Sequence, residues 1–193
     1  MQRLHNQLRA SFDKQFGHLK SKNKHENLNI GPGFDVDPEF INADKTQSLG
    51  AEVLWDLEET PSPFQANRFR LVVASHVLEH VYRLMPLMDE LYRIMQPGGH
   101  LVIFVPYYAS HAAIANPEHV RFFSEQSWCF FNKEMDEAGP GKYDMGRKCN
   151  FIPDCTILEP HPEFLKLPEE ELSRRIQHEW NIVREMCVVL RKE

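Results

Sequence analysis

The sequence predicts an α/β fold with a largely parallel sheet, and three short segments in a fixed order predict it. Residues 28–33, Leu-Asn-Ile-Gly-Pro-Gly, place a glycine turn after an apolar run. Residues 74–80, Ala-Ser-His-Val-Leu-Glu-His, place polar side chains after a second apolar run. Residues 95–99, Met-Gln-Pro-Gly-Gly, end a helical pattern just before a third apolar run. In open sheets of this kind ligands, often nucleotides, bind beyond the carboxyl ends of the strands.

Length and composition bound the class of protein. At 193 residues we expect a single domain over 1–193, which would bury about 70% of the surface of its unfolded chain. Four cysteines form no CxxC pair, which favours a reduced, cytoplasmic setting. No apolar stretch approaches the ~20 residues of a membrane-spanning helix, so no membrane segment is expected. The net charge of −6 argues against broad contact with a nucleic-acid duplex.

Short apolar runs predict the strands, because strands buried on both faces of a sheet are continuously apolar. We predict strands at 28–30, 40–43, 51–55, 70–74, 101–105, 155–158 and 182–190. Only ten residues separate Gly33 from Asp44, too few for a full crossover helix plus a strand, so a shortened first helix is expected. The spacing before the last run leaves the direction of that strand open.

Helices are predicted where apolar residues recur three and four apart. Positions 4, 8, 12, 16 and 19 predict an amphipathic helix within 1–26, which either packs on the domain or forms a lid over a site. A second helix begins at Pro86 and stops at the Pro-Gly-Gly of 97–99. Ser124 is placed to cap a short helix through Phe131, and Pro168 to His178 forms another. We expect substrate contacts in the insertion at 107–150.

The glycine turn and two acidic residues after strands are candidates for nucleotide binding. Gly31 and Gly33 would let the backbone approach a ligand and would expose N–H groups to it. Asp44, after the second predicted strand, either accepts hydrogen bonds from both hydroxyls of a ribose or is a solvated turn residue. Asp56, after the third, either addresses an adenine edge or caps a helix.

The run from His76 to His80 matches the HxxEH motif of zinc proteases, in which two histidines bind metal and the glutamate activates water. That motif needs a regular helix and a third ligand, whereas here it directly follows the β-like run 71–74. We therefore assign no metal ligands and interpret both histidines as polar side chains at the mouth of a pocket. A zinc hydrolase, with metal on His76 and His80, is the competing hypothesis.

Residues 116–123, Asn-Pro-Glu-His-Val-Arg-Phe-Phe, combine a base, a cation and aromatic rings. His119 could take a proton from an acceptor hydroxyl or amine, and Arg121 could hold an anionic group. The competing interpretation is a surface turn with two core phenylalanines. Tyr107 and Tyr108, just past the fifth predicted strand, either contact substrate or pack.

Over residues 28–131 the sequence resembles class I S-adenosylmethionine-dependent methyltransferases, in particular small type-11-like members. The run LNIGPG, Asp44, the pair Asp56 and Leu57, the run SHVLEH and the run QPGG look like that family's motifs in the same order. Pro32 stands where the family usually has a small residue or cysteine, and the family's third glycine is absent.

The resemblance implies a Rossmann-like, doubly wound sheet of seven strands, mostly parallel, with the last strand at 182–190 antiparallel. It also implies S-adenosylmethionine as cofactor. Gly31 and Gly33 would face its methionine part, and Asp44 its ribose. The full set of residues that we expect to bind it is Asn29, Gly31, Pro32, Gly33, Asp44, Asp56, Leu57, Ser75 and His76.

The function expected from the resemblance is methyl transfer to an O, N or C atom of a small-molecule or sugar-like acceptor. The acidic charge and the lack of a visible macromolecule-binding segment favour a small acceptor. His119 and His80 are the candidate catalytic residues, and Tyr107, Tyr108 and Arg121 are the candidate substrate contacts. The altered glycine run motivates an alternative, a catalytically silent cofactor-binding or scaffolding subunit.

Overall fold

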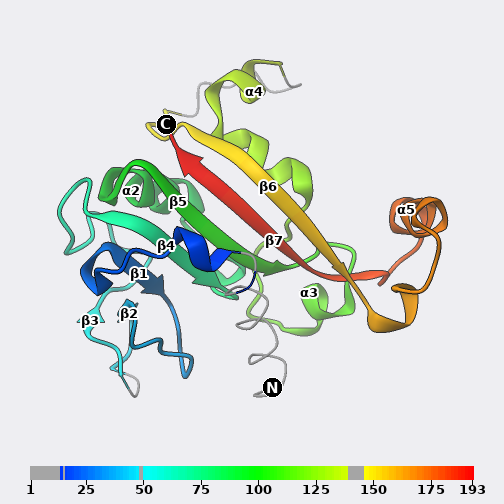
Figure 1. The fold of residues 1–193 in the computed structure, drawn as a ribbon, viewed down its shortest axis with the longest axis horizontal. Coiled ribbons are helices and arrows are strands. Elements are labelled where there is room, and N and C mark those ends of the chain that lie inside the picture. Colours follow the sequence, from blue (N-terminus) through cyan, green and yellow to red (C-terminus); the bar gives the residue numbers. More distant parts are fainter. Residues whose placement is uncertain (1–13, 15, 48–49, 139–145) are drawn as a thin grey trace.

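The computed structural model describes residues 14, 16–47, 50–138 and 146–193. The described part contains a seven-stranded sheet in the order β3-β2-β1-β4-β5-β7-β6 (Figure 1). β7 pairs antiparallel with both β5 and β6, and the remaining pairs are parallel. The expected mostly parallel sheet with a reversed last strand is therefore confirmed. Its strands are β1 Asn27–Ile30, β2 Ile41–Asp44, β3 Val53–Leu54, β4 Phe69–Ser75, β5 Met95–Pro106, β6 Phe151–Pro160 and β7 Val183–Lys192.

The central strands are buried on both faces, as their apolar runs predict. In β5 the side chains of Leu101, Ile103 and Val105 enter the main core, whereas Val102 and Phe104 enter a smaller cluster on the opposite face. β6 extends beyond the predicted 155–158 because its antiparallel pairing with β7 continues along almost the whole of β7. β5 extends beyond the predicted 101–105 because His100 and Pro106 pair with β7 and Met95 pairs with β4. Pairing with a neighbour, rather than local apolarity, determines where these strands end.

Helices cover the main core more than the opposite face. The buried apolar side chains of α2 and of η4 all belong to the main core. The predicted short helix after Ser124 is confirmed as η4, in which Ser124 and Ser127 form a capping box. α5 lies beyond the ends of β6 and β7 (Figure 1), and none of its residues is buried. The helices are α2 Leu84–Ile94, α3 His111–Ala115, α4 Lys133–Ala138 and α5 Glu169–His178, with 3-10 turns η1 Gly17–Leu19, η2 Lys24–Glu26, η3 Leu78–His80, η4 Glu125–Phe131 and η5 Pro162–Phe164.

The bounds of α2 differ from the prediction at both ends. The helix begins at Leu84, so Pro86 is its third residue, where the missing N–H removes no intrahelical hydrogen bond. It ends at Ile94, before the Pro-Gly-Gly run, because the backbone N–H groups of residues 67 and 68 donate hydrogen bonds to the last two carbonyls of the helix, those of Arg93 and Ile94. Met95 then enters β5, and Lys192 Nζ donates to its carbonyl at 2.9 Å.

No helix forms between β1 and β2, so the expected shortened first helix is wrong. The connection at 31–40 is held instead by Asn29 and Asn42, which are paired neighbours in the sheet. Asn29 Nδ2 donates to the Asp35 carbonyl and to Asn42 Oδ1, each at 3.2 Å, and Asn42 Nδ2 donates to the Asp37 carbonyl at 2.8 Å. Side-chain amides thus satisfy backbone groups that a helix would otherwise pair.

The predicted N-terminal helix falls largely outside the described residues. Of its apolar positions, Phe16 is buried and Leu19 is half-buried, both against the smaller cluster, which also contains Phe40. These two contacts agree with a packing role for positions 16 and 19. Within the described ranges, no helix combines the length and the apolar character that crossing a membrane requires.

Candidate cofactor and acceptor site

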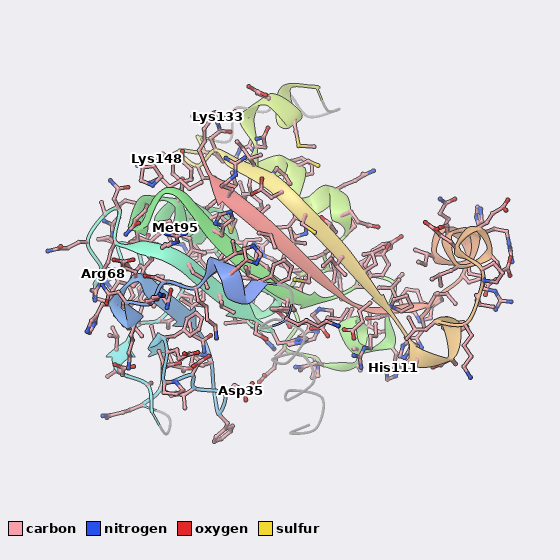
Figure 2. All side chains as sticks on the ribbon, viewed as in Figure 1. Asp35, Arg68, Met95, His111, Lys133 and Lys148 are labelled. Atoms are coloured by element: carbon pink, nitrogen blue, oxygen red, sulfur yellow. The ribbon has the colours of Figure 1, made fainter. Side chains whose placement is uncertain are left out.

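The residues predicted to bind a ligand gather where β1, β2 and β4 end. Figure 2 shows Asp35, which follows the glycine turn, and His111, which begins α3, along the lower edge of the molecule. Met95, where β5 begins, and Lys148 lie toward the opposite edge in the same view. The lower edge therefore holds the carboxyl ends of the parallel strands, where ligands of open α/β sheets bind.

The glycine turn after β1 contains two left-handed residues with different surroundings. Gly31 has φ +58° and Gly33 has φ +56°, a region that favours glycine. A Cβ on Gly31 would lie 2.3 Å from Val77 Cγ2, whereas a Cβ on Gly33 would meet no atom within 4 Å. Gly31 N–H donates to the Ala43 carbonyl at 2.8 Å, and Gly33 N–H donates to Asp44 Oδ2 at 3.0 Å. The expectation that these two N–H groups are exposed to a ligand is therefore wrong, although Gly33 does border open space.

Asp44 connects the end of β2 to this turn. Its Oδ2 accepts the Gly33 hydrogen bond, and its Oδ1 accepts from the N–H and the hydroxyl of Thr46 at 2.9 and 3.0 Å. Burial raises the pKa of Asp44, but these hydrogen bonds and the charge of Lys45 outweigh it and hold the pKa below its ordinary value. Because each carboxylate oxygen has two acceptor positions, Oδ2 retains one for a hydroxyl donor.

A hollow of about 450 Å³ lies beside the ends of β2 and β3, within the ~300–1,000 Å³ range of ligand pockets. Asp56 lines it, but its Oδ1 also accepts from the Glu58 N–H at 3.0 Å, which closes a local turn. No helix directly follows Asp56 in the described range 50–138, so the alternative role as a helix cap is wrong. The side chain of Leu57 is buried in the main core, so any ligand contact there would come from its backbone. The hollow is lined by Lys45, Leu54, Trp55, Asp56, Glu59, Pro61, Ser62 and Pro63.

His76 lies directly after Ser75, the last residue of β4, and adopts φ +50°. Its Nε2 lies 2.8 Å from Glu185 Oε1, and its Nδ1 lies 3.5 Å from Glu79 Oε1. Burial lowers the pKa of His76, but the Glu185 and Glu79 carboxylates outweigh it and raise the pKa to about 10. At neutral pH His76 is therefore a cation paired with two buried carboxylates.

His80 and His119, the two candidate catalytic residues, come from distant segments and lie together. Their ring centroids are 4.8 Å apart, in an edge-to-face arrangement. His80 Nδ1 lies 3.2 Å from the Glu118 carbonyl oxygen, and His119 Nδ1 lies 2.8 Å from that of Ala113. Because a carbonyl can only accept, we assign the proton of each neutral ring to Nδ1. Each Nε2 then keeps a free lone pair.

Arg121 is engaged by backbone rather than free for an anionic group. Its Nε donates to the Val81 carbonyl at 2.8 Å, and its Nη2 donates to the carbonyl of Tyr82. Phe122 is 55% exposed, while Phe123 is buried, so only one of the two phenylalanines is a core residue. Arg121 thus positions the segment that follows η3.

The two tyrosines after β5 have different surroundings. Tyr107 is buried, and its hydroxyl lies 3.3 Å from Glu125 Oε2. Burial, and next the Glu125 charge, raise the pKa of that hydroxyl above its ordinary value. Tyr108 is 45% exposed at the same edge of the sheet, so it is the one with ring surface available to a substrate.

Two residues of this site escaped the sequence analysis. Thr46 supplies two of the three hydrogen bonds on Asp44, and Glu185 pairs with His76. A signal for Glu185 is present in the sequence, since it is an acidic residue at the start of the apolar run of β7. The proximity of Thr46 to Asp44 follows from its position two residues later, which is typical of an Asx turn.

Comparison with known proteins identifies the fold. Residues 25–103 match the family model of a methyltransferase domain. A solved S-adenosylmethionine-dependent methyltransferase from Archaeoglobus fulgidus is similar, with a TM-score of 0.67 and 17% identity over 97% of this chain and 94% of that one. So is a geranyl diphosphate C-methyltransferase from Streptomyces coelicolor A3(2), with a TM-score of 0.62 and 11% identity over 98% and 81% of the two chains. The matched segment carries the glycine turn and Asp44 and spans less than half of the chain, and the fold of the whole chain is similar to that of S-adenosylmethionine-dependent methyltransferases.

Among curated proteins the similar ones are much longer than this chain. A highly reducing polyketide synthase, aurA, from Calcarisporium arbuscula is 36% identical over 75 residues, which are 38% of this chain and 3% of the synthase. The probable polyketide synthase 28 of Dictyostelium discoideum is 30% identical over 103 residues, 43% of this chain and 4% of that protein. The alignments thus span only a small part of these relatives.

Proposed function

We propose that this chain transfers a methyl group from S-adenosylmethionine to an O, N or C atom of a small-molecule or sugar-like acceptor. The observation that carries the proposal is the pairing of Gly33, which borders open space, with the ionised Asp44 at the carboxyl edge of a class I methyltransferase fold. When bound, the cofactor supplies a methyl group on a positively charged sulfur, which a nucleophile can displace.

The residues at this edge fit the cofactor. Asp44 Oδ2 retains one acceptor position for a ribose hydroxyl, and a side chain at Gly33 would enter the space beside the turn. The hollow at Trp55 and Asp56 supports an adenine site.

The loops after β4 and β5 support an acceptor site. They carry the paired imidazoles of His80 and His119, whose free Nε2 atoms can accept a proton from a hydroxyl or an amine. Side chains on the same loops are exposed although apolar or aromatic, which favours an acceptor with an apolar part: Tyr82, Tyr108, Ile114 and Phe122. The names of the relatives, polyketide synthases and a geranyl diphosphate methyltransferase, support a small-molecule acceptor.

The cysteines support a reducing, cytoplasmic setting for this activity. All four are unpaired: Cys129, Cys149, Cys155 and Cys187. Burial raises the pKa of the Cys149 thiol to about 12 and also raises that of Cys187, so both remain protonated and weakly reactive at neutral pH.

Methyl transfer can be tested with methyl-labelled S-adenosylmethionine and a panel of hydroxyl, phenol, amine and enol acceptors with apolar substituents. The proposal expects a labelled product and one S-adenosylhomocysteine for each methyl group transferred. Binding of the cofactor without product from any acceptor class would instead support the silent cofactor-binding subunit. The Asp44→Ala variant serves as the low-affinity control in this assay.

A further inference from the structure

We propose that Glu79, His80 and His119 bind a single divalent cation of the zinc class. The three residues each offer one ligand atom, a carboxylate oxygen or an imidazole nitrogen, and these atoms all lie within 4.8 Å of one another. Two imidazoles and one carboxylate form a ligand set found in catalytic zinc sites, which keep a further position open. The set differs from the HxxEH hypothesis, because His119 takes the place of His76.

Glu79 is the residue whose surroundings call for a cation. Its side chain is 2% exposed, and neither carboxylate oxygen has a hydrogen-bond partner among the described residues. His76 Nδ1 is 3.5 Å away, and the same imidazole pairs with Glu185 at 2.8 Å. Whatever its protonation state, His76 supplies at most one positive charge to two buried carboxylates. Since a buried carboxylate without hydrogen bonds is costly, a cation on Glu79 would remove that cost.

The two histidines are already oriented as metal ligands usually are. In metal sites the second ring nitrogen of a ligating histidine commonly donates to a backbone carbonyl or a carboxylate, which directs the first nitrogen at the metal. The Nδ1 atoms of His80 and His119 contact backbone carbonyl oxygens in this way. Val120 N–H also donates to the Glu79 carbonyl at 2.9 Å, so the segments that carry the three ligands are joined.

The spacing shows what must move when a cation binds. With bonds of about 2.0–2.1 Å, tetrahedral ligands lie about 3.3 Å apart, less than the 4.8 Å limit within which these atoms lie. Both imidazoles are only half-buried, so rotation of the rings can close this distance. Glu79 is buried in η3 and remains the fixed ligand.

The role of the cation rests on the proposed methyl transfer, whereas its binding does not. η3 follows the carboxyl end of β4 closely, so the site lies at the edge where we place the acceptor. A cation with an open position would bind an acceptor oxygen and lower its pKa, in place of proton removal by either imidazole. The acceptor class then narrows to hydroxyl, phenol or enol oxygen compounds.

Metal binding can be measured without any assay of activity. The full-length protein, treated with a chelator and freed of any affinity tag, is titrated with Co²⁺ by visible absorption and with Zn²⁺ by calorimetry. We expect one Co²⁺ per chain, displaced by Zn²⁺. Glu79→Gln and His119→Gln should each weaken binding by at least about 100-fold, since even loss of an outer-shell partner costs about 10–100-fold.

Two histidine variants serve as matched controls. His76→Gln lies beside the site but outside the ligand set, and His100→Gln changes a histidine that pairs with Asp154 on another part of the sheet. His100→Gln should bind Co²⁺ as the parent protein does, and His76→Gln should bind it at least as tightly, since it removes the imidazole that lies 3.5 Å from Glu79 Oε1. His119 is on a loop and half-buried, so His119→Gln tests the site even if Glu79→Gln fails to fold.

The site is refuted if the parent protein binds no Co²⁺, if both ligand variants bind normally, or if an intense thiolate band shows cysteine ligands. Loss of binding in His76→Gln with retention in His119→Gln would instead establish the HxxEH pairing and overturn the set proposed here. Methyl transfer that is equally fast in the metal-free protein would overturn the role of the cation alone. Stoichiometric Co²⁺ with no methyl transfer to any acceptor would support the site and count against the proposed function.

Discussion

Alanine substitutions at Gly31 and Gly33 separate what the turn contributes to folding from what it contributes to binding. Both glycines have left-handed backbones of nearly equal φ, so alanine should strain each backbone by a similar amount. They differ in surroundings, because a Cβ on Gly31 would lie 2.3 Å from Val77 Cγ2 and a Cβ on Gly33 would meet nothing within 4 Å. Gly31→Ala should therefore lose more stability than Gly33→Ala.

The expected magnitudes follow from these two contributions. A left-handed non-glycine residue costs about 1–2 kcal/mol, and overpacking a filled site adds about 1–3 kcal/mol. Gly33→Ala should thus lower the free energy of unfolding by about 1–2 kcal/mol and Gly31→Ala by about 2–5 kcal/mol. For a chain of this size each kcal/mol lowers the melting temperature by about 2–4 °C. Gly33→Ala, although the milder change for folding, should weaken cofactor binding because its methyl group enters the open space.

Urea unfolding of both variants, of Val77→Ala and of Gly31→Ala/Val77→Ala measures the two contributions separately. In the double variant the nearest remaining contact of the new Cβ is Val77 Cβ at 3.0 Å, so most of the overpacking is relieved. We expect a favourable coupling energy of about 1–3 kcal/mol between the two positions. Equal losses for Gly31→Ala and Gly33→Ala, together with no coupling to Val77, would refute the reasoning.

Two further predictions concern Glu90, which is buried, and Arg121, which is half-buried. Burial raises the pKa of Glu90, but hydrogen bonds from Arg93 and Ser62 outweigh it and hold the pKa below its ordinary value. The carboxylate therefore stabilises the fold above about pH 4.5, and this stabilisation is lost as the pH falls through the folded-state pKa. Glu90→Gln should lower the free energy of unfolding at pH 7 by about 1.5–3 kcal/mol, and its stability should fall less steeply as the pH is lowered. An acid transition by circular dichroism that matches that of the parent protein would contradict this. Arg121→Ala should lower the free energy of unfolding by about 1–3 kcal/mol, measured by thermal unfolding, since it leaves two backbone carbonyls without donors. Unchanged stability together with a raised KM would instead support an anion-binding role for Arg121.

Most of the sheet could be predicted from the sequence because buried parallel strands are short, continuous apolar runs. The ends of β5 and β6 could not, since pairing with β7 extends them through residues of low strand propensity such as Pro106 and Pro153. The sequence wrongly predicted a short helix between β1 and β2 for a related reason. Its place is taken by hydrogen bonds from the side-chain amides of Asn29 and Asn42 to backbone carbonyls of the connection, and such a cross-strand pair has no local signature in the sequence.

The candidate site was predictable in position but less so in detail. Strand ends locate Gly33, Asp44 and His76, because side chains after parallel strands meet at one edge. Which partner each side chain takes depends on contacts between distant segments. His119 meets His80, and Glu185 meets His76, across separations that no spacing rule covers. The roles of individual residues in binding and catalysis stay predictions.

Calorimetry of S-adenosylhomocysteine binding tests the central claim, that the cofactor lies against the turn at 31–33 with its ribose on Asp44. Loss of a hydrogen bond to a charged group costs about 1.5–3 kcal/mol, so Asp44→Ala should weaken binding roughly 10- to 150-fold. Asp154→Asn on β6, whose carboxylate pairs with Arg191 at 2.9 Å, is the control that should bind like the parent protein. Equal affinity for the parent protein, Asp44→Ala and Asp154→Asn would contradict the account.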